Sequence, residues 1–327
     1  MKQHYKSWGL YPPANHKNII RLHWISDIPD LNRIETSVLP YGLGRSYGDN
    51  CLNNNNTLLD TSRISRFIEF DKESGIIKCE AGVSFAEILK VIVPNGWFFP
   101  VTPGTKFVTV GGAIANDVHG KNHHSAGTFG RHIISFELLK SSGQKYICSA
   151  TENTELYKAT IGGMGLTGLI LWAQIKLKPI KNSYINVETV KFKNLDEFFK
   201  LSEKSSKNYE YIVSWVDCTS RGKNFGRGLF FRGNHSNLDK SELPQPKTPK
   251  RIPFPFTAPS FILNRFTLKI ANSILYRSQF KKQQKGIKHY DPFFYPLDSI
   301  LNWNRMYGRR GFFQYQCVVP YSDGGKA

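Results

Sequence analysis

Two segments dense in glycine and other small residues constrain the fold of this chain more than any other feature. One runs from Pro40 to Asn50 (PYGLGRSYGDN), and the other from Pro103 to Gly120 (PGTKFVTVGGAIANDVHG). Closely spaced glycines let backbone N–H groups converge on an anion with no Cβ in the way. The two segments therefore predict a site for a phosphate-bearing ligand, and a pyrophosphate fits best.

The first segment contains part of a dinucleotide-binding fingerprint, Gly42-Leu43-Gly44. The next residues do not complete it, and no helical run follows to form a βαβ unit, so a Rossmann fold is not expected. The glycines, with Arg45 and Ser46, can still wrap a diphosphate as a loop between strands. On this segment alone, a plain glycine turn is an equal alternative.

The second segment is more specific. Gly111-Gly112-Ala113-Ile114-Ala115 can pack flat against a planar group. Polar side chains follow in quick succession: Asn116, Asp117, His119, Lys121, His123 and His124. Three histidines suggest a metal, but no acidic residue at matched spacing and no His-Glu-x-x-His motif completes a ligand set. We therefore expect no metal, and the lack of a Gly-x-Ser-x-Gly elbow disfavours a serine hydrolase.

Composition narrows the class of protein. No window approaches the roughly 18 apolar residues of a membrane span, and no secretory signal follows Met1, so we expect a cytoplasmic protein. The five cysteines are scattered without a Cys-x-x-Cys pair and are expected to be free thiols. The net charge of +19 suits nucleic acid, an anionic membrane surface or an acidic substrate.

The local patterns predict an α+β fold. We expect strands at 57–60, 67–70, 75–82, 169–178 and 211–216, a hairpin of 132–140 with 144–149, and helices at 155–160 and 195–201. Ser84 and Glu87 form a capping box before a helix that Pro94-Asn95-Gly96 ends. Glycine density falls after Pro179, which places a domain boundary near residue 180.

The stretch from Lys240 to Tyr290 holds eleven Lys and Arg against one Glu, a local charge of +10. Within it, Phe261 to Tyr276 places apolar residues at helical spacing, with basic residues on the flank. This pattern is typical of an amphipathic helix on an anionic surface. A basic loop with a solvated helix face is a slightly favoured alternative.

Three runs together resemble a known family: Pro40 to Asn50, Pro103 to Gly130, and Gly162 to Gly168 (GGMGLTG). They are similar to flavoproteins with the FAD-binding domain of p-cresol methylhydroxylase and vanillyl-alcohol oxidase, and within these to the oxidases of polyprenyl-phosphate-linked ribose. The likeness runs from about residue 38 to 180 and returns at Gly311 to Pro320. It implies non-covalent FAD, a two-subdomain FAD-binding domain over 1–180, and an α+β substrate domain with an antiparallel sheet over 181–327.

The resemblance also implies site residues. Those expected to bind the cofactor are Pro40, Tyr41, Gly42, Leu43, Gly44, Arg45, Ser46, Tyr47, Gly48, Asp49, Asn50, Gly104, Thr109, Val110, Gly111, Gly112, Asn116, Asp117, Val118, His119 and Ile170. His119 and Lys121 are expected at the reacting centre, with positioning and electrostatic roles. Lys121, Gln314 and Gln316 are expected to bind substrate. The plainer alternatives are a backbone-bound histidine and a surface lysine.

Gln314 and Gln316 alternate in Phe313 to Cys317, so we expect them on one face of a strand. A merely polar strand face is an equal alternative. Members of the family continue beyond the position of Ala327, with a cysteine, a lysine and a tyrosine that reach the pocket, and Cys317 is not that cysteine. We therefore expect the substrate domain to be truncated at its C-terminus.

The implied reaction is FAD-dependent oxidation of the ribose 2′-hydroxyl of a polyprenyl-phosphate-linked pentose, the first half of an epimerisation in the synthesis of a cell-wall or glycan precursor. A short-chain reductase is the expected partner, with peripheral contact to the inner face of an anionic plasma membrane. One alternative is an oxidase or dehydrogenase of a soluble sugar or aldonolactone. A basic nucleic-acid-binding protein is a remote one, because no zinc-finger, RNA-recognition or helix-turn-helix signature is present.

Overall fold

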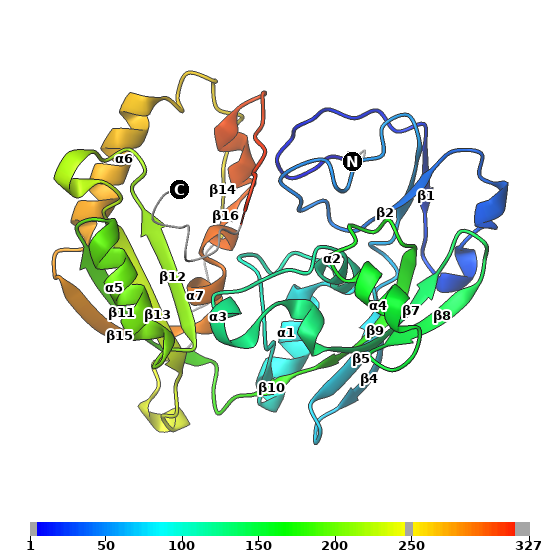
Figure 1. The fold of residues 1–327 in the computed structure, drawn as a ribbon, viewed down its shortest axis with the longest axis horizontal. Helices are drawn as coiled ribbons and strands as arrows, with labels where there is room; N and C mark the ends of the chain where they lie inside the picture. The colour runs from blue at the N-terminus through cyan, green and yellow to red at the C-terminus, as the bar shows by residue number, and fades with distance from the viewer. Residues whose placement is uncertain (1–4, 246–250, 318–327) are drawn as a thin grey trace.

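A computed structural model describes residues 5–245 and 251–317 of the chain. Two predicted stretches lie partly outside this description. They are the family-like stretch Gly311 to Pro320, which lacks 318–320, and the basic stretch Lys240 to Tyr290, which lacks 246–250. The rest forms the expected α+β arrangement. In Figure 1, a five-stranded sheet with β1 and β2 lies to the right, and a four-stranded sheet with α5 and α6 lies to the left.

The five-stranded sheet is antiparallel throughout and contributes side chains to the main hydrophobic core. Its order is β4 (Phe67–Asp71), β5 (Ile76–Glu80), β9 (Leu169–Lys176), β7 (Ile133–Leu139) and β8 (Lys145–Ser149). The inward residues Ile77, Phe136 and Ala173 are buried completely. The predicted strands and the β7–β8 hairpin are confirmed.

Helix α1 (Phe85–Ile92) covers this core as its local sequence predicts. Ser84 Oγ accepts a hydrogen bond from Glu87 N at 3.3 Å, and Glu87 Oε2 accepts one from Ser84 N at 2.8 Å. The four apolar residues at helical spacing, Phe85, Ile88, Leu89 and Ile92, are buried. Gly96, in the left-handed region at φ 80°, ends the 3₁₀ turn that follows the helix.

A small parallel sheet holds the first glycine segment. Its order is β1 (Asn18–Arg21), β3 (Thr57–Asp60) and β2 (Val38–Tyr41). The sequence predicts β3 alone. Tyr41 ends β2, so the glycine segment begins as this strand leaves the sheet.

The four-stranded sheet is antiparallel, in the order β12 (Tyr211–Val216), β13 (Gly228–His235), β11 (Tyr184–Phe192) and β15 (Gln283–His289). Helix α5 (Leu195–Ser206) packs against it, around Phe192 and Phe230. The predictions of β12 and α5 are confirmed. The boundary near residue 180 stays a prediction.

The remaining elements are short, apart from α6 (Arg265–Ser278). The helices are α2 (Val110–Ala115), α3 (His123–Ala126), α4 (Thr154–Thr160) and α7 (Tyr290–Phe294), and the paired strands are β6 (Trp97–Phe98) with β10 (Lys178–Pro179) and β14 (Ile252–Pro253) with β16 (Ile300–Leu301). Single 3₁₀ turns lie at Ile25–Asp27, Leu31–Arg33, Val93–Asn95, Phe129–His132, Gly222–Asn224, Lys240–Glu242, Pro296–Ser299 and Trp303–Tyr307. No helix within the described ranges is long and apolar enough to cross a bilayer.

Residues of α7 and the turn after it attach the second glycine segment to the later half of the chain. The buried Lys106 Nζ forms an ion pair with Asp291. Asp298 accepts hydrogen bonds from Thr105 Oγ1 at 2.6 Å and from Lys106 N at 3.0 Å. Thr102 and the fully buried Tyr295 hydroxyl are 2.7 Å apart. The loop 103–109 is therefore fixed by side chains almost two hundred residues away.

Because Lys106 is buried, we expect Lys106→Ala to leave the Asp291 carboxylate without a partner and to lower the free energy of unfolding by about 3–5 kcal/mol. The double variant Lys106→Met, Asp291→Leu removes both charges and should recover most of that loss. Urea-induced unfolding followed by circular dichroism measures both. Equal destabilisation of the two variants would show that the charge pair is not what holds the loop.

Candidate functional site

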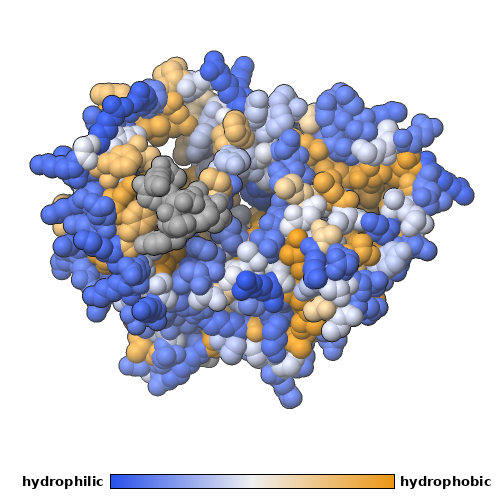
Figure 2. Space-filling view, in the orientation of Figure 1, coloured by the Kyte–Doolittle hydropathy of each residue, from blue (hydrophilic) through white to orange (hydrophobic). Residues whose placement is uncertain are grey.

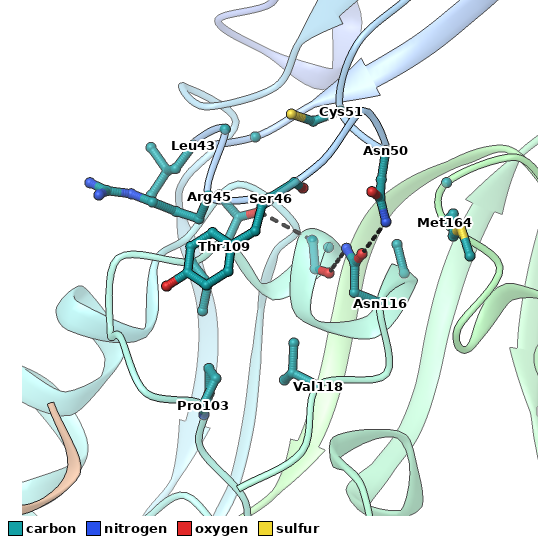
Figure 3. Close-up of a pocket in the computed structure, with 18 of the residues that line it drawn as sticks. Leu43, Arg45, Ser46, Asn50, Cys51, Pro103, Thr109, Asn116, Val118 and Met164 are labelled. Atoms are coloured by element: carbon teal, nitrogen blue, oxygen red, sulfur yellow. Dashed lines mark hydrogen bonds between the residues drawn. The ribbon is translucent and has the colours of Figure 1, made fainter. Parts of the chain in front are cut away.

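A cavity of about 600 Å³ opens where the three glycine-rich segments meet. Figure 3 shows its wall, with Ser46 and Asn50 on one side and Thr109, Asn116 and Val118 on the other. The sequence-predicted residues on this wall are Pro40, Gly42, Leu43, Gly44, Arg45, Ser46, Tyr47, Gly48, Asn50, Gly104, Thr109, Gly111, Gly112, Asn116, Val118, His119, Ile170, Gln314 and Gln316.

The first glycine segment is held against the N-terminal stretch of the chain. Tyr41 Oη donates to the carbonyl of Lys6 at 2.8 Å, and Gly9 N donates to the carbonyl of Ser46 at 3.3 Å. Gly44 has φ 60°, and a Cβ there would collide with the Tyr41 hydroxyl. A glycine is therefore required at this turn.

The side chain of Arg45 stacks on aromatic rings. Its Cζ lies 4.1 Å from the Trp8 ring centroid and 5.3 Å from that of Phe107. Its buried Nε finds no hydrogen-bond partner among the described residues, and burial lowers the pKa of the guanidinium. In Figure 3 the side chain extends away from Thr109 and Asn116. The stacked cation therefore braces the loop, while Arg45 remains part of the cavity wall.

Helix α2 meets this loop through residues that lack a Cβ. Thr109 caps the helix, since its Oγ1 accepts a hydrogen bond from Gly112 N at 3.1 Å. A Cβ on Gly42 would lie 2.6 Å from that same Oγ1, and one on Gly111 would lie 3.1 Å from Ala81 Cβ. Real Cβ atoms do not approach so closely without displacing a neighbour. The glycines thus allow the loop after β2, α2 and the turn after β5 to come together.

Other glycines face open space. A Cβ on Gly104 would meet no atom within 4 Å, and one on Gly48 would meet only Asn50 Oδ1, at 3.5 Å. Both residues line the cavity, so their missing side chains leave room inside it. A ligand can therefore approach the backbone closely at both positions.

The wall beyond α2 carries the polar groups predicted for chemistry. Asn116 accepts a hydrogen bond from Asn50 Nδ2 at 3.4 Å, drawn in Figure 3. His119 Nε2 lies 3.1 Å from Gln316 Nε2 and 3.4 Å from its Oε1. Lys121 does not line the cavity: its Nζ donates to the carbonyl of Phe294 at 3.4 Å, and burial lowers its pKa to about 8.

The prediction of a strand from Phe313 to Cys317 is wrong, because the structure has no strand at these residues. The backbone hydrogen bonds here are few: the preceding Phe312 N donates to the carbonyl of Gly9 at 2.7 Å, and Gln314 N donates to that of Tyr47 at 3.0 Å. The segment thus lies along the N-terminal stretch and the first glycine loop instead of joining a sheet. Gln314 and Gln316 still both face the cavity.

Four residues predicted to bind the cofactor lie off the cavity wall: Tyr41, Asp49, Val110 and Asp117. Tyr41 and Val110 are buried, and Asp117 Oδ1 accepts a hydrogen bond from Gly130 N at 2.9 Å. Wall residues that the prediction omits include Cys51, Thr61, Ala81, Met164, Gly165, Gly168, Leu297 and Trp303. The third glycine cluster was a sufficient signal for Met164 to Gly168, whereas nothing in the local sequence marks Trp303.

Within the described ranges, no three His, Cys, Asp or Glu side chains are grouped so that they could hold a metal ion. The rings of His119 and His123 are 6.1 Å apart, as are those of His123 and His124.

Comparison with known proteins agrees with this geometry. Residues 29–149 match the FAD binding domain family. The chain is 38% identical to decaprenylphosphoryl-beta-D-ribose oxidase of Mycolicibacterium smegmatis over 291 residues, 86% of this chain and 63% of that protein. It is 30% identical to an uncharacterised Streptomyces coelicolor protein over 256 residues, 73% of this chain and 67% of that one. The chain belongs to the FAD-binding oxidoreductases.

A more distant relative is the Delta(24)-sterol reductase of Mus musculus, 26% identical over 143 residues, which are 44% of this chain and 28% of the reductase. The family match covers both of the first two glycine segments. This FAD-binding oxidoreductase spans less than two thirds of the Mycolicibacterium relative.

The residues on the wall fit FAD. The backbone at Gly48 and Gly104 lies beside empty space, as a diphosphate requires, and α2 brings small residues to the same wall. The cavity also has room for a planar ring system, because no side chain blocks access at Gly48 or Gly104. These residues would hold the cofactor by backbone contacts instead of by paired charges.

We expect Gly104→Val to fill cofactor space and weaken FAD binding about tenfold or more, as overpacking does elsewhere, with no loss of fold. Gly286→Val is a matched control, because a Cβ at Gly286 also meets nothing within 4 Å but lies on β15, away from the cavity. Titration of the apoprotein with FAD, followed by flavin fluorescence, measures the affinity. Equal affinity in both variants would place the cofactor elsewhere.

Proposed function

We propose that this FAD-binding oxidoreductase oxidises the 2′-hydroxyl of a polyprenyl-phosphate-linked ribose to a keto sugar. The observation that carries the proposal is the contact between His119 and Gln316 on the cavity wall that also bears the glycine segments. The name of the Mycolicibacterium relative, a decaprenylphosphoryl-ribose oxidase, supports the substrate class. In this proposal the reaction belongs to the synthesis of a cell-wall or glycan precursor.

When bound, FAD accepts a hydride, with its two electrons, from the carbon that bears the hydroxyl. The hydroxyl proton must then leave its oxygen. His119 can take it on Nε2, which faces the cavity, once the substrate hydroxyl replaces the Gln316 amide at that nitrogen. The nearer Gln316 atom, Nε2 at 3.1 Å, can only donate, so this contact favours the tautomer with the ring proton on Nδ1 and the lone pair on Nε2.

The segment that carries Gln314 and Gln316 is held in place by a backbone hydrogen bond. The hydrogen bond from Gln314 N to the carbonyl of Tyr47 ties this segment to the first glycine loop. Two amide side chains in the cavity can hold sugar hydroxyls, as both donors and acceptors. The bond therefore fixes the amides proposed to bind the sugar relative to the glycine loop proposed to bind the cofactor.

Lys121 is a positioning residue in this proposal. Ile212 N donates to its carbonyl at 2.8 Å, and its ammonium is held at the Phe294 carbonyl. The residue therefore joins the turn that bears His119 to β12 and α7. A reductase that returns the keto sugar to an alcohol of inverted configuration is the partner that this chemistry needs.

The decisive test is anaerobic mixing of the FAD-loaded protein with candidate substrates. We expect polyprenylphosphoryl ribose to bleach the flavin absorbance, and free ribose or an aldonolactone not to do so. Bleaching by the free sugars alone would favour an oxidase of soluble sugars. No FAD uptake, combined with tight, salt-dependent binding of DNA or RNA, would overturn the flavoenzyme proposal altogether.

Replacing His119 tests its proton-accepting role. We expect His119→Ala to lower the rate of flavin reduction by about 10²–10⁴-fold, the usual contribution of a general base. His124→Ala is the matched control, since His124 contacts the Tyr209 carbonyl at 3.2 Å and lies off the cavity wall. Stopped-flow absorbance gives both rates. Similar rates in the two variants would show that His119 is not the proton acceptor.

A further inference from the structure

Helix α6 turns its apolar side chains outward. Phe266, Ile270 and Ile274 recur every four residues and form one stripe, 71%, 46% and 65% exposed. Phe261 and Phe280, just outside the two ends, are 76% and 94% exposed. No residue of α6 is buried.

The side of α6 that touches the protein is polar. Asn272 Nδ2 donates to Asp217 Oδ1 at 2.9 Å, Ser273 Oγ accepts from Arg227 at 3.2 Å, and Tyr276 Oη donates to the carbonyl of Phe192 at 3.2 Å. A surface helix usually has the opposite arrangement, with its apolar stripe against the core. An exposed stripe of this kind marks a surface that binds something.

The surroundings of the stripe are basic. Arg265, Lys269 and Arg277 lie on α6, and Lys281 and Lys282 follow it. No acidic residue occurs in the sequence between Arg251 and Lys288. Figure 2 shows apolar side chains on the α6 side of the molecule among hydrophilic ones. The surface therefore joins exposed apolar groups to cations.

This combination favours one occupant over two others. A nucleic acid would neutralise the cations but leave the phenylalanine and isoleucines in water. A second copy of the chain, facing its own α6, would bring like charges together, which costs free energy. An anionic bilayer suits both features, because basic residues meet the phospholipid headgroups while apolar ones enter the boundary with the acyl chains.

We propose that α6 binds the surface of an anionic phospholipid membrane, with Phe266, Ile270 and Ile274 inserted at the headgroup boundary. Asn264 fixes where the helix begins, since its side chain accepts hydrogen bonds from Phe266 N and Thr267 N. The contacts to Asp217 and Arg227 attach the helix by its polar side and keep the stripe outward. The inference goes beyond the proposed oxidation and requires neither FAD nor a sugar.

Flotation with phosphatidylcholine vesicles, with and without phosphatidylglycerol, tests the proposal on the whole 327-residue chain. We expect the wild type to float only with the anionic vesicles. Phe266→Ser, Ile270→Ser and Ile274→Ser together should abolish flotation. Phe67→Ser with Ile68→Ser, an exposed apolar pair on β4, is the matched control and should float like the wild type.

The charges are tested separately. Each of Arg265→Gln, Lys269→Gln and Arg277→Gln should weaken vesicle binding about fivefold, and added salt should weaken the wild type in the same way. Lys72→Gln, Lys145→Gln and Lys193→Gln, exposed elsewhere on the molecule, should change it little. Circular dichroism melting confirms that each variant is folded.

Three results would overturn the proposal. The wild type could fail to float with anionic vesicles, or the stripe variant could float as well as the β4 control. Alternatively, analytical ultracentrifugation could show a wild-type dimer that the stripe variant loses, which would make a second copy the occupant. None of these results bears on whether the protein takes up FAD or reduces it with a sugar, so the two proposals fail independently.

Discussion

The close approach of three chain segments at glycine positions is the constraint on which the site depends. The loop after β2 reaches Thr109 because Gly42 has no Cβ, and α2 reaches the turn after β5 because Gly111 has none. Larger side chains would separate these backbones, and overpacking at one such point costs about 1–3 kcal/mol. The same packing that joins the parallel sheet to the main core therefore leaves bare backbone facing the cavity.

The cavity also depends on the later half of the chain. Asp291 and Asp298 hold the loop 103–109 from outside, while the stacking of Arg45 on Trp8 braces the first glycine loop. Trp303 continues this brace, since its ring centroid lies 5.7 Å from that of Trp8 and 5.8 Å from that of Tyr47. The cofactor wall and the candidate substrate segment are thus parts of one packed unit, and movement of either would disturb the other.

The elements that the sequence predicts correctly depend on residues that are close together in the chain. The α1 capping box and the β7–β8 hairpin are each determined by residues near one another in the sequence, and both form as predicted. The orientation of Arg45 depends on Trp8 and Phe107, far away in the sequence, so no local pattern could reveal it. The alternation of Gln314 and Gln316 placed both on one side correctly, but a strand also needs a neighbouring strand, and that segment has only isolated backbone bonds.

The excess of positive charge acquires a different meaning once the site is known. Backbone amides in the glycine segments can bind a diphosphate without any full charge. Arg45, the cation predicted to assist them, lines the cavity and stacks on Trp8. The local charge of +10 between Lys240 and Tyr290 is therefore not needed to hold the cofactor. The basic residues of this stretch lie on and beside α6. The polar side of α6 already forms hydrogen bonds with Asp217 and Phe192. The basic residues can therefore interact with whatever binds the apolar stripe.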